Sequence, residues 1–196
     1  MTAPPPAGPS SSTPSSAPSP SLVPPSASGP ADPPAPVDAD LLRAVGSRLP
    51  AGVVVVTARW RGLLHAATVS TFVPVSLEPP LVLVCLHTDS RLREALDEVP
   101  GWSVSVLAQD GGPVADWVAS PGRPAFDGLA RVPHADAPWS GGAWLDGAAA
   151  WFDVRTVDVH PAGDHDVVVG EVVAARAGDP ARGGLVHLRG RTRPVV

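Results

Sequence analysis

Residues 63–96 restrict the fold of this chain more than any other segment, because they hold strand and helix patterns separated by clear breaks. Leu63–Thr71 is rich in small and hydroxyl side chains, and Leu81–Leu86 is an apolar run typical of a buried strand. Glu78-Pro79-Pro80 separates Leu81–Leu86 from a further expected strand, Val73–Leu77, because proline cannot donate a ladder hydrogen bond. Ser90–Glu98 then has the pattern of a short helix. The segment predicts a sheet-forming domain with small helices.

The rest of the domain has the same balance of many strands and few helices. An amphipathic helix is expected at residues 38–48 and a second helix at 113–119, whereas residues 121–143 are expected to cross the surface. The remaining expected strands are Val53–Ala58, Val73–Leu77, Trp102–Leu107, Ala148–His160, Asp166–Arg176 and Leu185–Arg189, the last of which closes the sheet. This order predicts a mainly β fold, a β-barrel with a few peripheral helices.

The first 36 residues differ in composition from everything that follows. They hold half of the 26 prolines, interleaved with Ser and Ala and without Lys or Arg. Such a segment buries too little apolar surface to offset its ordering entropy, so residues 1–36 are expected to form a disordered tail. They lack the basic start and apolar core of a secretory signal, and no run is long enough to span a membrane. Residues 37–196 are expected to form one domain.

Charge and cysteine content exclude several classes of function. A net charge of −5 argues against a nucleic-acid partner, because no basic stripe is present to neutralise phosphates. The single cysteine, Cys85, excludes an intramolecular disulfide and fails every multi-cysteine zinc spacing, so no metal site is predicted. Because Cys85 lies in an apolar strand, we interpret its side chain as a small buried hydrophobic group rather than a nucleophile. A cytoplasmic protein is the natural interpretation.

Two neighbouring features suit a phosphorylated, planar cofactor. The turn after Leu86 leads into a helix whose first amides are unpaired, and Arg91 adds a cationic fork that matches phosphate oxygens. The alternative is that Asp89 or Ser90 merely caps the helix, and both roles are compatible. In the expected strand Leu63–Thr71, alternation places Thr68 and Ser70 on one face and Val69 and Thr71 on the other. These are also ordinary strand residues.

Four stretches, in their order and spacing, carry a family resemblance. They are Pro-Ala-Gly-Val-Val-Val-Val-Thr at 50–57, Ser76–Cys85, Trp102–Leu107, and Gly163-Asp164-His165-Asp166 before a valine run. Over residues 38–193 the chain resembles the flavin reductase-like, FMN-binding split-barrel family. The resemblance implies a split β-barrel and an NAD(P)H-dependent reductase of FMN, or of FAD. It also implies a partner monooxygenase that receives the reduced flavin, and a homodimer.

The resemblance also implies roles for individual residues. In such a site the flavin is held by strand backbone and hydroxyl groups, by the phosphate cradle and by an aromatic side chain: Thr68, Val69, Ser70, Thr71, Cys85, Leu86, Ser90, Arg91 and Phe126. His165 is implied at the reacting face and in nicotinamide binding, and Arg189 with Arg191 in contact with the dinucleotide phosphates. From composition alone, His165 is equally a turn histidine exposed to water, and the arginines are equally part of a solvated end strand.

The chain departs from the family pattern in two places, and two other functions stay open. His187-Leu188 stands where the family commonly has an aromatic-His pair before Arg-Gly-Arg, and Thr192 stands where an aromatic residue follows it. Ala66-Ala67 replaces a frequent Gly-Met. NADH and NADPH are therefore both open. One alternative is a flavin-binding split barrel without reductase activity, such as a flavin carrier or a related oxidase. The other is a β-barrel interaction module without a cofactor. Four tryptophans are consistent with a dimer surface or with the core: Trp117, Trp139, Trp144 and Trp151.

Overall fold

The computed structural model describes residues 34–120, 122, 129 and 131–195. Residues 1–33 of the predicted tail, and Phe126, lie outside the described residues. The unit considered below begins at Asp38. None of the helices in the described ranges has the length and apolar character that crossing a membrane requires.

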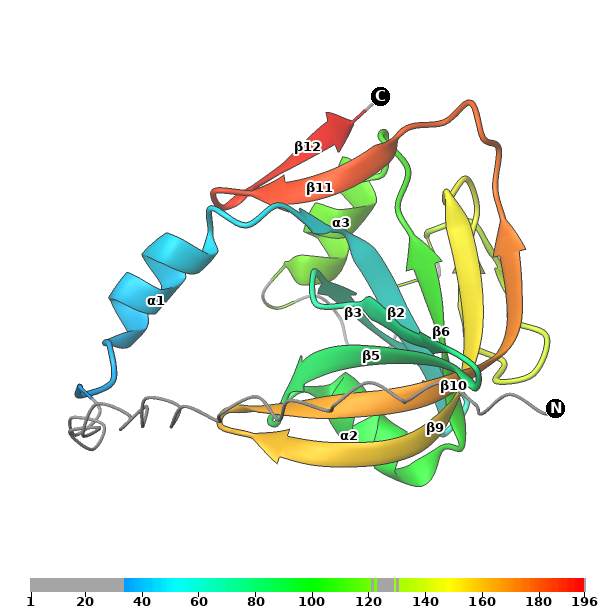
Figure 1. The fold of residues 1–196 in the computed structure, drawn as a ribbon. Coiled ribbons are helices and arrows are strands. Elements are labelled where there is room, and N and C mark those ends of the chain that lie inside the picture. The colour runs from blue at the N-terminus through cyan, green and yellow to red at the C-terminus, as the bar shows by residue number, and fades with distance from the viewer. Residues whose placement is uncertain (1–33, 121, 123–128, 130, 196) are drawn as a thin grey trace, which may run out of the picture. The chain divides into compact units, whose positions relative to one another are not determined.

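Strands dominate this unit, with short helices between them (Figure 1). The helices are α1 (Ala39–Gly46), α2 (Arg91–Glu98) and α3 (Gly112–Ala119). The strands are β1 (Ala51–Gly52), β2 (Val54–Trp60), β3 (Leu63–Val69), β4 (Val73–Leu77), β5 (Pro80–His87), β6 (Gly101–Val106), β7 (His134–Asp136), β8 (Ala143–Leu145), β9 (Ala150–Ala162), β10 (His165–Ala177), β11 (Gly184–Leu188) and β12 (Arg191–Val195). The predicted mainly β fold is confirmed.

Seven strands form one antiparallel sheet in the order β3-β2-β6-β9-β10-β5-β4. The long strands β9 and β10 pair through two register shifts, next to Gly170 and Val172. Bulges bend a strand, and Figure 1 shows β10 running beneath the sheet and then turning upward. Gly170 suits this bend because a Cβ there would lie 2.3 Å from a methyl of Val154 and 3.1 Å from Trp102. The sheet curls into a barrel that is split at its edge strands, β3 and β4.

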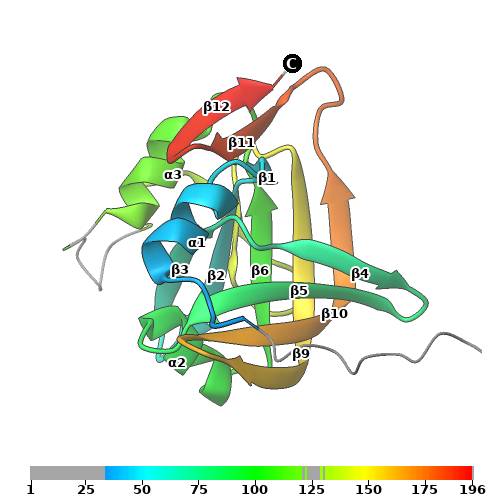
Figure 2. The ribbon, with the colours of Figure 1, turned by 60° about the vertical axis from the view of Figure 1, so that its left-hand side comes forward.

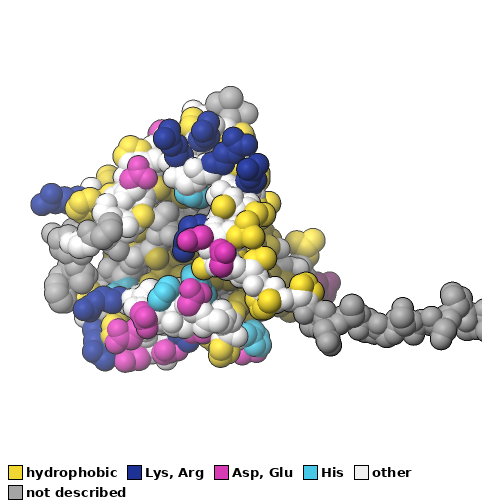
Figure 3. All heavy atoms as spheres, turned by 90° about the vertical axis from the view of Figure 1, so that its left-hand side faces the viewer, with side chains coloured by type: hydrophobic (Ala, Val, Ile, Leu, Met, Phe, Trp, Pro, Cys, Tyr) yellow, Lys and Arg dark blue, Asp and Glu magenta, His cyan; other side chains and the backbone are white. Residues whose placement is uncertain are grey.

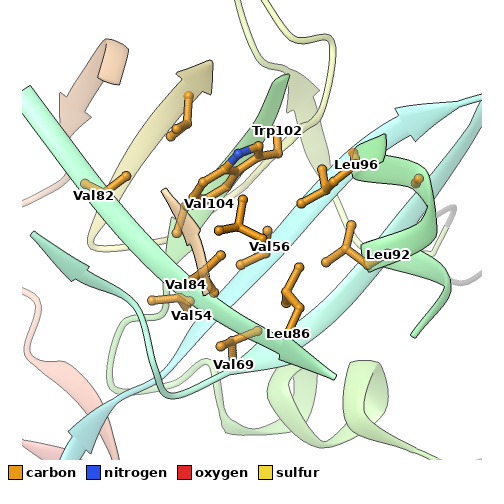
Figure 4. Close-up of a cluster of buried hydrophobic side chains, with 14 of the residues drawn as sticks. Val54, Val56, Val69, Val82, Val84, Leu86, Leu92, Leu96, Trp102 and Val104 are labelled. Carbon is orange, nitrogen blue, oxygen red and sulfur yellow. The ribbon is translucent and has the colours of Figure 1, made fainter. Parts of the chain in front are cut away.

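The main core fills the barrel between β2, β5, β6 and α2. Figure 4 shows Leu92 and Leu96 of α2 pointing toward Val56 of β2. Trp102 of β6 lies fully buried in the same cluster. Each fully buried side chain of this size stabilises the fold by about 1.5–3 kcal/mol. The α2 helix is therefore fixed to the barrel by its own core residues.

Two expectations about the C-terminal half are corrected. Strand β11 does not close the main sheet but pairs with β1 and β12 in a separate three-stranded sheet. Residues 121–143 are not only a surface excursion, because they contain β7 and because Leu129 and Ala143 are buried in a second core with Leu185. Short β1, β7 and β8 have too few residues for a recognisable alternation.

Helix α1 forms where the sequence predicts it but buries none of its residues. Asp38 caps it by accepting the Leu41 backbone N–H at 2.7 Å. Its apolar side chains are solvent-exposed in this chain, and Leu42 is 64% exposed. The four tryptophans are expected in the core or on a dimer surface. Trp144 and Trp151 are buried in the core, whereas Trp117 and Trp139 are exposed.

Candidate functional site

Strand β3 forms one edge of the main sheet and connects the features of the site. It pairs with β2 on one side, so alternate backbone groups point away from β2. Figure 2 shows α2 near one end of β3, and α3 with the β11–β12 hairpin near the other.

The predicted flavin-binding residues at the end of β3 have different surroundings. The Thr68 hydroxyl donates to the Ala115 carbonyl of α3 at 2.8 Å, and Val69 is part of the core. Ser70 is exposed. The Thr71 hydroxyl both accepts the backbone N–H of Cys85 and donates to its carbonyl, each at 3.1 Å. Thr71 thus joins the end of β3 to β5 across the split.

A cavity of about 440 Å³ lies against the second half of β3. Its walls come from β3, α3 and the β11–β12 hairpin. The lining residues are Val53, Thr68, Val69, Ser70, Ala115, Asp116, Ala119, His187, Gly190, Arg191 and Thr192. The wall is therefore mixed, with apolar groups, hydroxyls and charged side chains of both signs.

A second cavity, of about 240 Å³, lies against the first half of β3. It is lined by four β3 residues and by the start of α2: Leu64, His65, Ala66, Ala67, Ser90, Arg91 and Leu92. The two cavities share one strand as a common wall. A ligand that spans both lies along β3.

At the start of α2, two arginines have opposite environments. Ser90 caps the helix by accepting the Arg93 backbone N–H at 3.1 Å, so the capping role is present. Arg93 is held by Asp97 at 2.6 Å and by Asp166 at 2.7 Å, and its side chain is only 11% exposed. Burial opposes its charge, but hydrogen bonds and charge interactions with both carboxylates outweigh burial and raise the Arg93 pKa. Arg91 is exposed and, in the described part of the chain, forms no ion pair.

His165 is the first residue of β10, and hydrogen bonds and a ring contact hold it and the adjacent Asp164 in place. Its Nδ1 is 2.7 Å from Asp164, and this hydrogen bond, followed by the His165 charge, holds the Asp164 pKa below its usual range. An ionised carboxylate only accepts, so Nδ1 carries the proton of this hydrogen bond. His87, the cross-strand partner of His165, packs edge-on with ring centroids 5.3 Å apart. Thr88 donates its backbone N–H to the Asp164 carbonyl at 3.1 Å.

Leu86 and Cys85 directly precede His87 in β5. Leu86 is buried in the core, and Cys85 is half-buried with its backbone held by Thr71. Only main-chain atoms of Leu86 are therefore available to a ligand. The thiol has no nearby group that marks it as a nucleophile.

Arg189 and Gly190 form the two-residue turn of the β11–β12 hairpin. Both have positive φ, 52° and 71°, as a type I′ turn requires. The Arg189 backbone N–H donates to the Ser47 carbonyl at 2.8 Å, which ties the turn to the end of α1. Its side chain is exposed.

Comparison with known proteins identifies the family. A family model described as a flavin reductase like domain matches residues 46–195. The chain belongs to the flavin reductase-like family. An actinorhodin polyketide dimerase of Streptomyces coelicolor is 40% identical over 136 residues, which are 69% of this chain and 75% of that protein. The NADH-dependent FMN reductase AsuE2 of Streptomyces nodosus subsp. asukaensis is 38% identical over 148 residues, 76% of this chain and 80% of that protein.

A solved structure of this family has the same fold. BorF, the flavin reductase component of a bacterial two-component tryptophan halogenase, matches with a TM-score of 0.76 at 36% identity. The match covers 81% of this chain and 98% of BorF. The resemblance to flavin reductases and the split-barrel fold are confirmed.

The donors along β3 fit a flavin mononucleotide of the kind this flavin reductase-like family is named for. The smaller cavity offers a cation without a carboxylate partner and the first amides of α2, which match a phosphate. The β3 edge offers alternating N–H and C=O groups, which match a polar chain and a pyrimidine edge. The roles of individual residues stay predictions.

Two residues at this site were missed because neither forms part of a local motif. His87 contacts His165 through strand register, and only the β5–β10 pairing brings the two rings together. Asp116 lines the larger cavity from α3, which is far in sequence from the β3 and β11–β12 walls. A helical-wheel projection of residues 113–119 against β3 is the one signal that places Asp116 there.

Proposed function

We propose that this protein transfers a hydride from NAD(P)H to FMN, with FAD as the alternative flavin, and releases the reduced flavin. One observation carries the proposal: β3 is shared by two cavities, with Arg91 at the end of one and Arg191 in the wall of the other. Such a strand suits two phosphorylated ligands that meet along it.

On the α2 side, Arg91 and the first amides of α2 hold the flavin phosphate, while backbone groups of β3 orient the rest. Ser90 contributes mainly as the cap that keeps these amides in place. When bound, the flavin supplies the atom that accepts the hydride, so the chain needs alignment rather than a strong acid or base.

On the nicotinamide side, the hydrogen bond from Nδ1 to Asp164 orients the His165 ring and leaves Nε2 for the ligand. Arg189 and Arg191 meet the dinucleotide phosphates. His87 limits the rotation of the His165 ring through the edge-on contact.

We propose that the reduced flavin goes to a partner monooxygenase, and that both proteins are cytoplasmic. BorF is named as the reductase component of a two-component enzyme, which supports this division of labour. Both cavities are open to solvent at the β3 edge, which suits release of the flavin.

We propose that the protein is a homodimer whose contact includes α1 and β4. An eight-residue helix is marginal in water without tertiary packing, yet α1 buries no residue. On β4, Val73, Val75 and Leu77 are also exposed, Leu77 at 94%. A second copy covers both surfaces. Sedimentation of wild type and Leu42→Glu tests this: we expect a dimer and a monomer, and a monomeric wild type contradicts it.

Anaerobic absorbance tests the reductase activity. The protein is mixed with FMN and then with NADH or NADPH, and the flavin band is followed. We expect bleaching with at least one nucleotide. A bound yellow flavin that neither nucleotide bleaches indicates a flavin carrier or a related oxidase. Protein without affinity for FMN indicates an interaction module.

Arg91→Glu tests the phosphate assignment. The lost charge-assisted hydrogen bonds and the added repulsion correspond to FMN binding weaker by about tenfold to a hundredfold. Arg131→Glu is the control, because Arg131 is also exposed and without an ion pair in the described chain. Equal FMN affinity in wild type and Arg91→Glu contradicts the assignment.

His165→Ala tests the role at the nicotinamide face. We expect slower flavin reduction with little change in FMN affinity. His160→Ala is the matched control, because His160 lies on the same hairpin and also pairs with an aspartate, Asp158. Equal reduction rates in wild type and His165→Ala remove His165 from the reaction.

A further inference from the structure

Two Arg-Gly turns in this chain have the same backbone conformation but different side-chain environments. Arg61-Gly62 joins β2 to β3 with φ of 51° and 78°, and Arg189-Gly190 joins β11 to β12 with φ of 52° and 71°. Left-handed backbone is unfavourable for arginine, so each arginine carries a conformational cost that interactions elsewhere offset.

At the first turn, contacts within the chain supply that offset. The Arg61 guanidinium pairs with Glu98 at 3.0 Å and lies 4.2 Å from the centroid of the Trp60 ring. At the second turn, the Arg189 side chain forms neither an ion pair nor a ring contact with any described residue. An arginine held in an unfavourable conformation without an internal partner points to an external anion.

Three more arginines surround the second turn. Arg191 and Arg193 are two residues apart on β12 and so lie on one face of it. Arg48 directly follows Ser47, whose carbonyl accepts the Arg189 N–H. We call Arg48, Arg189, Arg191 and Arg193 the arginine cluster; all four are exposed, and none pairs with a carboxylate in the described chain. Figure 3 shows dark-blue side chains gathered over the top of the molecule, where this hairpin lies.

The arginine cluster borders the larger cavity, because Gly190 and Arg191 line it. Asp116, which lines the same cavity from α3, repels phosphate from the interior. An anionic group of a ligand in this cavity is therefore directed outward, over the hairpin. Arg91, the proposed contact of the flavin phosphate, lines the other cavity, at the start of α2.

We infer that the arginine cluster binds the 2′-phosphate of NADPH in addition to the dinucleotide diphosphate, so that the enzyme prefers NADPH to NADH. The inference rests on the proposed function. Arg189 and Arg191 match the two charges of the diphosphate, which leaves the arginines that flank them, Arg48 on one side and Arg193 on the other, for the 2′-phosphate. A phosphate monoester carries nearly two charges at neutral pH and matches the arginine fork. NADH offers no group to this second pair.

Calorimetric titration with adenine nucleotides tests this without flavin chemistry. The intact protein is titrated with 2′,5′-ADP and with 5′-ADP, and we expect at least about tenfold tighter binding of 2′,5′-ADP. The double variant Arg48→Ala/Arg193→Ala removes this difference, whereas Arg131→Ala keeps it. Steady-state reduction gives the same pattern as a ratio of kcat/KM for NADPH over NADH.

The outcomes separate this inference from the proposed function. Flavin reduction with equal or better use of NADH keeps the reductase and overturns the 2′-phosphate site. Tight 2′,5′-ADP binding without flavin reduction keeps the 2′-phosphate site and overturns the proposed reductase activity. If the double variant weakens FAD but not NADPH, the cluster binds the flavin adenylate and the inference is wrong. If it changes only transfer of flavin to an oxygenase, the cluster is a protein-docking surface and the inference is equally wrong.

Discussion

The α2 end of β3 and the β11–β12 hairpin both contain arginines, but they use them differently. Around α2, Arg61 and Arg93 are paired with carboxylates, and Arg93 is nearly buried. Around the hairpin, the arginine cluster has no carboxylate partner among the described residues. Helix α2 is also anchored by buried leucines, whereas β12 is mostly exposed.

The difference separates structural arginines from ligand-binding ones. A paired, buried arginine has its donors occupied and serves the fold. An unpaired arginine beside a cavity keeps its donors for an anion. By this criterion Arg91 is the exception within the α2 region, and it is the residue we assign to the flavin phosphate. The net charge of −5 by itself indicates neither the proposed phosphate site at Arg91 nor the arginine cluster.

Leu96→Ala gives the largest expected effect, because α2 rests on the main core. Removing this fully buried side chain lowers the free energy of unfolding by about 2–5 kcal/mol. Val195→Ala, at an exposed position of the hairpin, changes it by less than about 0.5 kcal/mol. Urea denaturation of both variants measures the difference. Equal losses show that the two regions are equally integrated into the fold.

Arg93→Ala tests whether the paired arginine is structural. It leaves the largely buried Asp166 carboxylate without a partner, so we expect a loss of about 1–3 kcal/mol in unfolding free energy. Arg193→Ala leaves stability within about 0.5 kcal/mol but weakens binding of phosphorylated nucleotides. An Arg93→Ala protein that is as stable as wild type contradicts the distinction between structural arginines near α2 and ligand-binding arginines at the hairpin.

Arg189→Gly and Arg61→Gly compare the two turns directly. Glycine relieves the left-handed backbone at either position, which is worth up to about 1 kcal/mol. At Arg61 the gain is offset by losing the Glu98 pair and the Trp60 contact, so no net stabilisation is expected. Arg189→Gly stabilises the protein and weakens NADPH binding. Thermal unfolding with nucleotide titration measures both, and identical shifts at the two turns contradict the comparison.

Asp164→Asn gives the smallest effect, which depends on pH. The His165 hydrogen bond lowers the Asp164 pKa in the folded state below its ordinary value of 3.8. Such a group stabilises the fold above pH 3.8, and the contribution disappears as pH falls through the lowered value. Thermal unfolding of wild type and variant is therefore expected to differ at pH 5 and to converge as the pH falls below 3.8 and through the lowered pKa. A constant difference across this range excludes the ionised pair.

Much of the fold was predictable because it depends on local patterns. The apolar run ending at Leu86, the Pro79-Pro80 break and the cap at Ser90 each specify their own element. The strand and the cap appear where expected, whereas Pro80 is the first residue of β5, so the break is limited to Glu78 and Pro79. The two-residue strand β1 and the three-residue strands β7 and β8 exist only through their partners, so no periodicity marks them. Helix α1 shows the reverse case, because its amphipathic pattern is correct but its apolar face buries no residue against the described part of the chain.

The site was predictable only where it follows a motif. Ser90 and Arg91 stand together at the start of a helix, and His165 follows a tight turn. The contact of His87 with His165 depends on strand register, and the approach of Arg48 to Arg189 depends on one hydrogen bond across the fold. Such long-range pairings are decided by the packing of the whole sheet. Phe126 lies outside the described residues, so its implied contact with the flavin ring stays a prediction.

A crystal structure with FMN and a nicotinamide dinucleotide bound tests the central claim most directly. We expect the flavin along β3, its phosphate on the Arg91 guanidinium and the first amides of α2, and the dinucleotide phosphates on the arginine cluster. Flavin density away from β3, or a phosphate that contacts neither Arg91 nor α2, contradicts the account.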